Sequence, residues 1–96
     1  MCGFQVGDQV VIEGTLPHLP RTELSAEQRT GIIAAKSQAP MGPIVYIDLG
    51  WPVYAGSFDS EGTAKRMFDI VRGLNPEFAG DGADVICISE EKIVHA

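Results

Sequence analysis

This chain has no long apolar run. Its 96 residues contain no stretch of about 18 consecutive apolar side chains, the length that crosses a bilayer as a helix. The opening Met-Cys-Gly-Phe-Gln also lacks a basic segment followed by an apolar one, which is the pattern of a secretory signal. We therefore expect a cytoplasmic protein, and the length predicts a single domain over residues 1–96.

Basic residues are scarce. Seven Lys and Arg stand against thirteen Asp and Glu, which gives a formal net charge of −6. An acidic surface repels phosphate groups and anionic lipid heads. The few basic side chains are scattered along the chain instead of forming a cluster. The composition thus argues against nucleic acid or a membrane as partner, and it leaves a small-molecule ligand or another protein.

Metal-binding and disulfide signals are weak. The two cysteines, Cys2 and Cys87, and the two histidines, His18 and His95, show no CxxC or HxxxH spacing, so we expect no metal. A Cys2–Cys87 bridge is an open alternative, although Cys87 lies in an apolar run and is most simply a small core residue. The segment 81–84, with an Asp at each end, fits a polar turn better than a calcium loop, because the terminal Glu of such a loop is missing.

Motifs for cofactors and nucleophilic catalysis are also missing. No glycine-rich dinucleotide or phosphate loop occurs, so no cofactor is expected. Cys2 beside His18 or His95 is a conceivable nucleophile and base, but no nucleophile signature surrounds any Cys or Ser.

Short runs rich in β-branched residues predict a mainly β fold. Val10 and Ile12 share one face of a run whose other face carries Gln9, Val11 and Glu13, and Val45, Ile47 and Leu49 share one face of a later run. Proline and glycine clusters separate the runs. The predicted strands are 8–14, 30–38, 44–49, 53–58, 84–89 and 93–95, with the run at 84–89 apolar on both sides and therefore central or covered by a helix.

One helix is predicted over residues 60–72. Its apolar residues recur at helical spacing, and Asp59 or Ser60 is placed to cap its start. Arg72 suits the negative end of the helix dipole, and Gly73 suits the position after the last turn. The predicted buried stripe consists of Ala64, Met67, Phe68 and Val71.

Two local features lie before and within the second predicted strand. Residues 15–28 form a long loop, and Ser25-Ala-Glu-Gln28 within it matches a capping box that winds one helical turn. Gly31 interrupts an otherwise apolar strand, which predicts a bulge or a tight bend there.

The opening of the chain resembles the SH3-like barrels of the nitrile hydratase β subunit and of KOW-type domains. The matching segments are Phe4-Gln-Val-Gly-Asp8 with Val10 and Val11, then Leu19-Pro-Arg21, then Arg29-Thr-Gly-Ile-Ile33. The resemblance implies a small barrel of five to six strands, here with the helix inserted before the last long strand. It also implies a supporting or binding part and not a catalytic one, because the cysteine cluster of the metal-bearing partner subunit is missing. Glu23 and Glu27 make the loop acidic where relatives tend to be basic.

Aromatic residues gather between positions 46 and 58. Tyr46, Trp51, Tyr54 and Phe58 lie around one strand pair and its break at Pro52. Aromatic rings with a polar tip are typical of recognition surfaces. The alternative is that two or three of them fill the core, and this interpretation is favoured for Phe58.

These observations predict a non-enzymatic binding or adaptor module for a small ligand or a protein segment. The predicted ligand-binding residues are Tyr46, Asp48, Trp51, Tyr54, His18 and Arg21. The alternatives are an accessory subunit of an enzyme complex and a small acid–base enzyme that uses Asp48, although Asp48 is more simply a turn-capping residue. A mean hydropathy of +0.08 predicts a homodimer.

Overall fold

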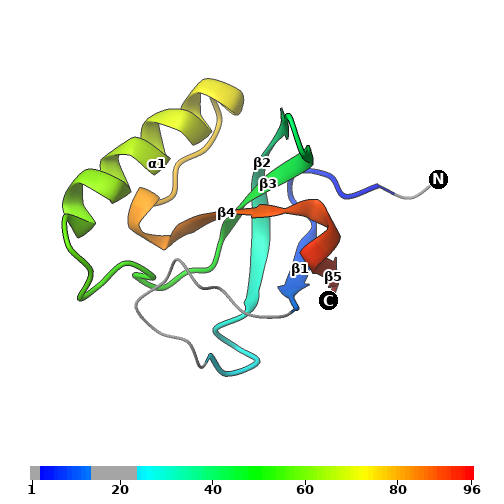
Figure 1. Cartoon of the computed structure of the whole chain (residues 1–96), viewed down its shortest axis with the longest axis horizontal. Coiled ribbons are helices and arrows are strands. Elements are labelled where there is room, and N and C mark those ends of the chain that lie inside the picture. The colour runs from blue at the N-terminus through cyan, green and yellow to red at the C-terminus, as the bar shows by residue number, and fades with distance from the viewer. Residues whose placement is uncertain (1–2, 14–23) are drawn as a thin grey trace.

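The computed structural model describes residues 3–13 and 24–96, and within them five antiparallel strands form one sheet. The strand order is β4-β3-β2-β1-β5, and a single α-helix precedes β4 (Figure 1). The predicted mainly β fold with one inserted helix is therefore confirmed. The elements are β1 Gln9–Ile12, β2 Thr30–Ala39, β3 Gly42–Asp48, α1 Ser60–Leu74, the 3₁₀ turn η1 Gly82–Asp84, β4 Val85–Ser89, the 3₁₀ turn η2 Glu90–Lys92 and β5 Ile93–His95.

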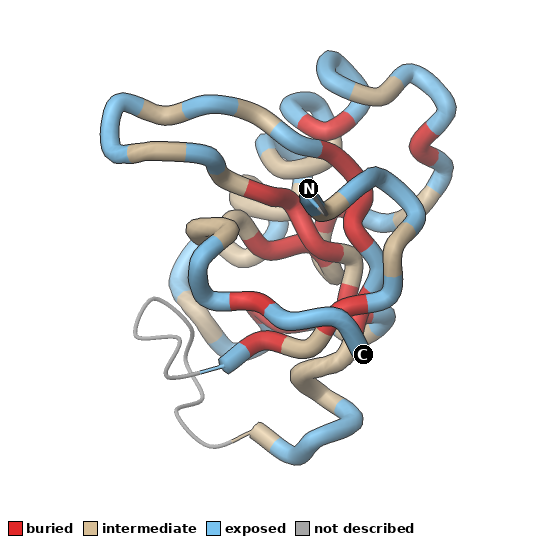
Figure 2. The backbone as a smooth tube through the Cα atoms, turned by 90° about the vertical axis from the view of Figure 1, so that its right-hand side faces the viewer, coloured by how far each residue is buried: buried red, intermediate tan, exposed pale blue. Residues whose placement is uncertain are grey.

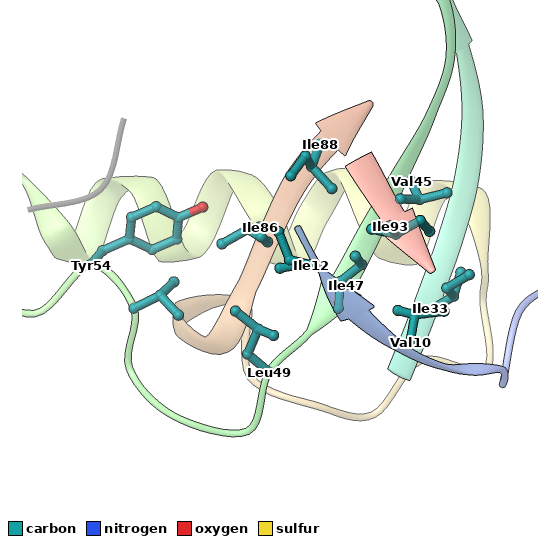
Figure 3. Close-up of a cluster of buried hydrophobic side chains, with 11 residues drawn as sticks. Val10, Ile12, Ile33, Val45, Ile47, Leu49, Tyr54, Ile86, Ile88 and Ile93 are labelled. Carbon is teal, nitrogen blue, oxygen red and sulfur yellow. The ribbon is translucent and has the colours of Figure 1, made fainter. Parts of the chain in front are cut away.

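The sheet curls around one apolar core. Side chains from all five strands point toward one another on its inner face, where the alternation in β1 and β3 predicts them (Figure 3). Buried positions accordingly gather where the strands cross, while the chain segments around them are exposed (Figure 2). Because β1 pairs with both β2 and β5, the first and last strands close over the same core. This inner core comprises Val10, Ile12, Ile33, Val45, Ile47, Leu49, Val53, Tyr54, Ile86, Ile88 and Ile93.

Helix α1 covers part of the outer face of the sheet. The predicted buried stripe is confirmed in part: Val71 is fully buried, Met67 and Phe68 are partly buried and pack with it against the strands, and Ala64 is partly exposed. The helix also lies directly on Gly82, where an added Cβ would come within 2.0 Å of the carbonyl oxygen of Ala64. The resulting outer core contains Ala34, Ala35, Tyr46, Val71, Phe78 and Val85.

Helix α1 begins at Ser60 as predicted, but the capping at its two ends differs from the prediction. Asp59 precedes the helix with φ of 58° and its side chain caps nothing, although its carbonyl accepts the Thr63 N–H at 3.0 Å. Gly73 lies inside the helix, which continues to Leu74. Asn75 ends it by taking extended backbone angles, with φ of −140°; its N–H still bonds to the Val71 carbonyl at 2.7 Å, and its side-chain amide donates to the Ala34 carbonyl at 2.8 Å.

The strand predicted over residues 53–58 is wrong. These residues form successive turns, with the Ala55 N–H donating to Pro52 and the Ser57 N–H to Tyr54. Gly56 takes a φ of 88°, which extended backbone does not use. Two consecutive residues, Val53 and Tyr54, are buried, so the in-and-out alternation of a strand is absent here.

The irregularity in β2 lies three residues beyond its predicted place. The register with β3 shifts between Ile33 and Ala35, so the bulge is at Ala34 and not at Gly31. Gly31 is instead a point of close approach, since a Cβ there would lie 2.6 Å from the Asp48 carbonyl oxygen and 2.7 Å from Ile47. The predicted capping box is confirmed, because Ser25 and Gln28 exchange side-chain-to-backbone hydrogen bonds of 3.0 and 3.2 Å.

Candidate binding surface on the outer face of the sheet

The two tyrosines predicted to bind ligand are buried in different cores. Tyr54 packs in the inner core, where its hydroxyl donates to the Val85 carbonyl at 2.8 Å (Figure 3). Tyr46 lies on the opposite face of the sheet, beneath α1 and beside Cys87. Burial raises the pKa of Tyr54 to about 12 and also raises the pKa of Tyr46, each with a smaller contribution from Cys87. The tyrosines therefore build the fold and form no common surface.

Trp51 and Phe58 have opposite environments. Trp51 is half-buried against the inner core, and its indole N–H donates to the Gln28 carbonyl at 3.0 Å. Phe58 is 100% exposed in the turn before α1. The interpretation of Phe58 as a core residue is thus wrong, because the turns between 53 and 59 carry its ring away from both cores.

Asp48 belongs to a row of residues that crosses four strands. Val85 of β4 lies opposite Asp48, Asp48 lies opposite Ile32 of β2, and Ile32 lies opposite Gln9 of β1. Directly opposed residues of antiparallel strands share one face. The row begins beneath α1 with Val85, which is fully buried, and continues onto open sheet at Ile32, which is 51% exposed.

A second row adds to the open part of this face. Thr30 of β2 lies opposite Val11 of β1, which in turn lies opposite Val94 of β5. Val94 is 40% exposed, and Thr30 and Val11 are partly exposed. We call Ile32, Thr30, Val11 and Val94 the open face. All four side chains are β-branched, and side chains of this type on a sheet are normally packed against another element.

A groove of about 280 Å³ adjoins the open face. Gly31 forms part of its wall and permits the close passage of β2 past the end of β3. Asp48 supplies a carboxylate, with Oδ1 accepting the Gly50 N–H at 3.0 Å as the turn-capping prediction states. The groove is lined by Gln9, Thr30, Gly31, Ile32, Asp48, Leu49 and Gly50.

The surroundings of the groove are negatively charged. Burial raises the pKa of Asp84, and the carboxylates of Asp48 and Asp81 raise it further. A positive group placed near Asp48 would relieve this mutual repulsion. The groove end of the surface therefore favours a cation, and the open face favours an apolar group.

The structure describes some of the other residues that the sequence singled out. Asp81 accepts the Ala83 N–H at 2.9 Å, so residues 81–84 form the expected polar turn. Cys87 carries a free thiol whose pKa is raised by burial. Among residues 3–13 and 24–96, no group of three His, Cys, Asp or Glu side chains could hold a metal ion. Cys2, His18, Arg21 and Glu23 lie outside the described residues.

The sequence contained a signal for the open face that the search for aromatic residues missed. Ile32 and Ile33 are adjacent in a strand, so one of the two must point away from the inner core.

In the described parts of the chain, no helix is both long and apolar enough to cross a membrane. Comparisons of the chain with protein-family models, with curated proteins and with solved structures found no match.

Proposed function

We propose that this domain is a non-catalytic binding module that holds a segment of a partner protein on its open face. The observation that carries the proposal is Ile32, a half-exposed isoleucine in the middle of a sheet face and beside the Asp48 groove. Charged or polar side chains normally occupy such positions in a sheet with one solvated face. Here the exposed side chains are β-branched and apolar, which supports a partner segment as their cover.

The chemistry of the surface defines the segment. Its apolar side chains would pack on Ile32 and Val94, and a Lys or Arg would reach the groove at Asp48. The net charge of −6 supports a positively charged partner, because complementary charges accelerate encounter and suppress wrong partners. The proposal includes a cytoplasmic location, which the free thiol of Cys87 fits.

A peptide with alternating Val and Lys residues tests the proposal. Titration should shift the NMR amide signals of residues 9–11, 30–32 and 48–50, and should change the fluorescence of Trp51, the single tryptophan of the chain. Ile32→Ala and Asp48→Asn should each weaken binding, and the amide oxygen that Asp48→Asn introduces can still accept the Gly50 N–H. Phe58→Ala removes a fully exposed apolar side chain elsewhere and should bind as the parent does.

Three results would contradict the proposal. The first is the absence of saturable shifts with this peptide. The second is equal binding of a peptide with Glu in place of Lys, which would remove the role of Asp48. The third is turnover by the isolated chain that disappears in Asp48→Asn, which would establish the acid–base enzyme instead.

Two forms of the partner follow from this surface. A second copy of the chain would make the predicted homodimer; it carries the same net charge of −6, so its contact would rest on the apolar open face alone, and sedimentation velocity would then show a dimer that Ile32→Ala dissociates. A catalytic chain would make the domain an accessory subunit, as the resemblance to the nitrile hydratase β subunit implies. Co-purification with an enzyme chain, lost in the same variant, distinguishes the second form from the first.

A further inference from the structure

Phe58 is a fully exposed aromatic residue that hydrogen bonds hold on both sides. Its side chain is 100% exposed in the turn before α1 and packs in neither core. On one side, the N–H and the hydroxyl of Ser57 both donate to the Tyr54 carbonyl, at 3.0 and 2.6 Å. On the other side, the Asp59 carbonyl accepts the Thr63 N–H in the first turn of α1. The ring is thus presented on a preformed turn, so an interaction need not order it.

A hollow of about 490 Å³ lies beside the first half of the same helix. It is formed between α1 and the segment 75–84, which runs back beside the helix to β4 (Figure 1). Ala64, Lys65 and Phe68 make the helix wall, and Ala79 and Gly80 belong to the opposite wall. Lys65 and Ala79 are exposed, so the hollow is open to solvent. Its volume is in the range of about 300–1,000 Å³ that is typical of binding pockets.

The helix wall of the hollow is aromatic and fixed in position. The Phe68 ring lies 5.9 Å from that of the buried Phe78, with the two planes inclined by 51°. The guanidinium carbon of Arg72 lies 5.6 Å from the centre of the Phe68 ring, and Arg72 also donates to the Phe78 carbonyl at 2.9 Å. Aromatic rings gain free energy from tilted or offset contacts beyond the area that they bury. The hollow therefore favours a further aromatic ring as its occupant.

The charges beside the hollow are self-complementary. Glu61, Lys65 and Phe68 recur at helical spacing and share one side of α1. Glu61 and Lys65 are exposed, and neither forms an ion pair within residues 3–13 and 24–96. Two copies of α1 that meet antiparallel about a two-fold axis at the level of Thr63 would place each Glu61 opposite the Lys65 of the other copy. The same register brings each Phe58 opposite the Phe68 of the other copy, and therefore to its hollow.

We propose that two copies of this chain associate through this side of α1, with the Phe58 ring of each copy in the hollow of the other. The occupant is a second copy because the chain itself supplies the ring, the hollow and both charges of the pair, as a two-fold symmetric contact requires. The paired charges also offset the repulsion between two chains of net charge −6. The hollow shares no residue with the open face or its groove, so this contact does not depend on the proposed function.

The size of the contact predicts a weak dimer. Aromatic side chains bury about 150–250 Å² each, so the two rings supply only part of the roughly 1,200–2,000 Å² of a stable interface. We therefore expect a dissociation constant of about 0.1–1 mM. The NMR amide signals of residues 58, 64–68 and 79–82 should shift as the protein is concentrated, and those of residues 9–11 and 30–32 should not.

Sedimentation velocity of exposed-residue variants tests the role of the ring. Phe58→Ala should raise the dissociation constant of the dimer by about tenfold or more, because a buried aromatic residue typically dominates a contact. Met41→Ala removes another apolar side chain, 99% exposed and outside the hollow, and should leave the dimer unchanged. Ile32→Ala should also leave it unchanged, which separates failure of this proposal from failure of the open-face proposal.

A charge exchange tests the register. Glu61→Lys and Lys65→Glu should each weaken the dimer, since each places like charges opposite one another in a pair of identical chains. An equimolar mixture of the two variants should associate about as well as the parent, because the mixed dimer pairs opposite charges at both positions. Mixing would not rescue a variant that had merely lost helix stability.

Four outcomes would overturn the proposal. The first is a monomer at every concentration up to about 1 mM, which would leave the ring and the hollow to a different protein. The second is an equal dissociation constant for Phe58→Ala and Met41→Ala, and the third is a mixture of the charge variants that stays monomeric. The fourth is a dimer that Ile32→Ala dissociates and Phe58→Ala does not, which would assign the contact to the open face.

Discussion

The outer face of the sheet has two halves with opposite environments. One half lies beneath α1, where Tyr46 and Val85 are buried in the outer core. The other half has no cover within the described residues, and Ile32 and Val94 are exposed there. Apolar side chains occupy both halves. Among the described residues α1 covers only one half of this face, and the proposed partner segment would cover the open half as α1 covers the other.

The boundary between the halves lies at the bulge in β2. The register shift at Ala34 changes the course of the strand between Ile32, on the open half, and Ala35, beneath α1. The row from Val85 through Asp48 to Ile32 crosses this boundary. Substitutions at its two ends therefore compare a covered and an open position on the same face of the sheet.

Val85→Ala should show the largest effect in this row. Val85 is fully buried between β4 and α1, so the substitution removes apolar contacts and leaves a cavity. We expect a loss of about 2–3 kcal/mol in the free energy of unfolding. Urea denaturation measures it, and a loss below that of the exposed Ile32→Ala would contradict the assigned cover by α1.

Gly31→Ala should come next. A methyl group at this position would meet the Asp48 carbonyl oxygen and the Ile47 side chain at under 3.0 Å, and a backbone atom yields little. We expect a loss of about 1–3 kcal/mol, with altered amide signals along residues 47–50. Gly73→Ala is the control, because nothing lies near an added Cβ there and the helix should become slightly more stable.

Tyr54→Phe should cost about 1 kcal/mol through the lost hydrogen bond to Val85. It should also change the dependence of stability on pH. Because burial raises the pKa of Tyr54 from 10.0 to about 12, the folded state keeps a proton that the unfolded state releases. The contribution of Tyr54 is complete below pH 10 and is lost as the pH rises to 12. Between pH 10 and pH 12 the unfolding temperature should decline less steeply in the variant than in the parent. Part of the decline that remains comes from Tyr46, whose pKa is also raised by burial.

Ile32→Ala should show the smallest effect on stability, within about 0.5 kcal/mol, because the side chain is already half in solvent. Its neighbour Ile33 is fully buried in the inner core, and Ile33→Ala should cost about 2–5 kcal/mol. Equal losses in the two variants, measured by urea denaturation, would remove the distinction between the open face and the cores.

The inner core and the helix could be predicted from sequence because each depends on a local period. Alternation placed Val10, Ile12, Val45 and Ile47 on one face, and helical spacing placed Val71 against the sheet. The end of the helix could not be predicted in the same way. It depends on the bond from Asn75 to Ala34, which lies 41 positions away along the chain.

The binding surface was harder to predict for a related reason. A tyrosine has the same sequence signature whether its hydroxyl meets solvent or a buried carbonyl, as that of Tyr54 does at Val85. The exposure of Ile32 depends on where α1 lies over the sheet, and the structure there includes the close approach of α1 to Gly82 and the bulge at Ala34. Both are tertiary features without a local period.

The amide of Asn75 adds a hydrogen bond between two elements that also pack together in the outer core. It donates to the carbonyl of the bulged residue Ala34, so straightening the bend in β2 would break this bond at the end of α1. Slow breathing of the native protein should therefore free these two regions together, as one cooperative unit in hydrogen exchange. A partner segment bound beside the bend would then slow hydrogen exchange at the C-terminal end of α1 without contacting it.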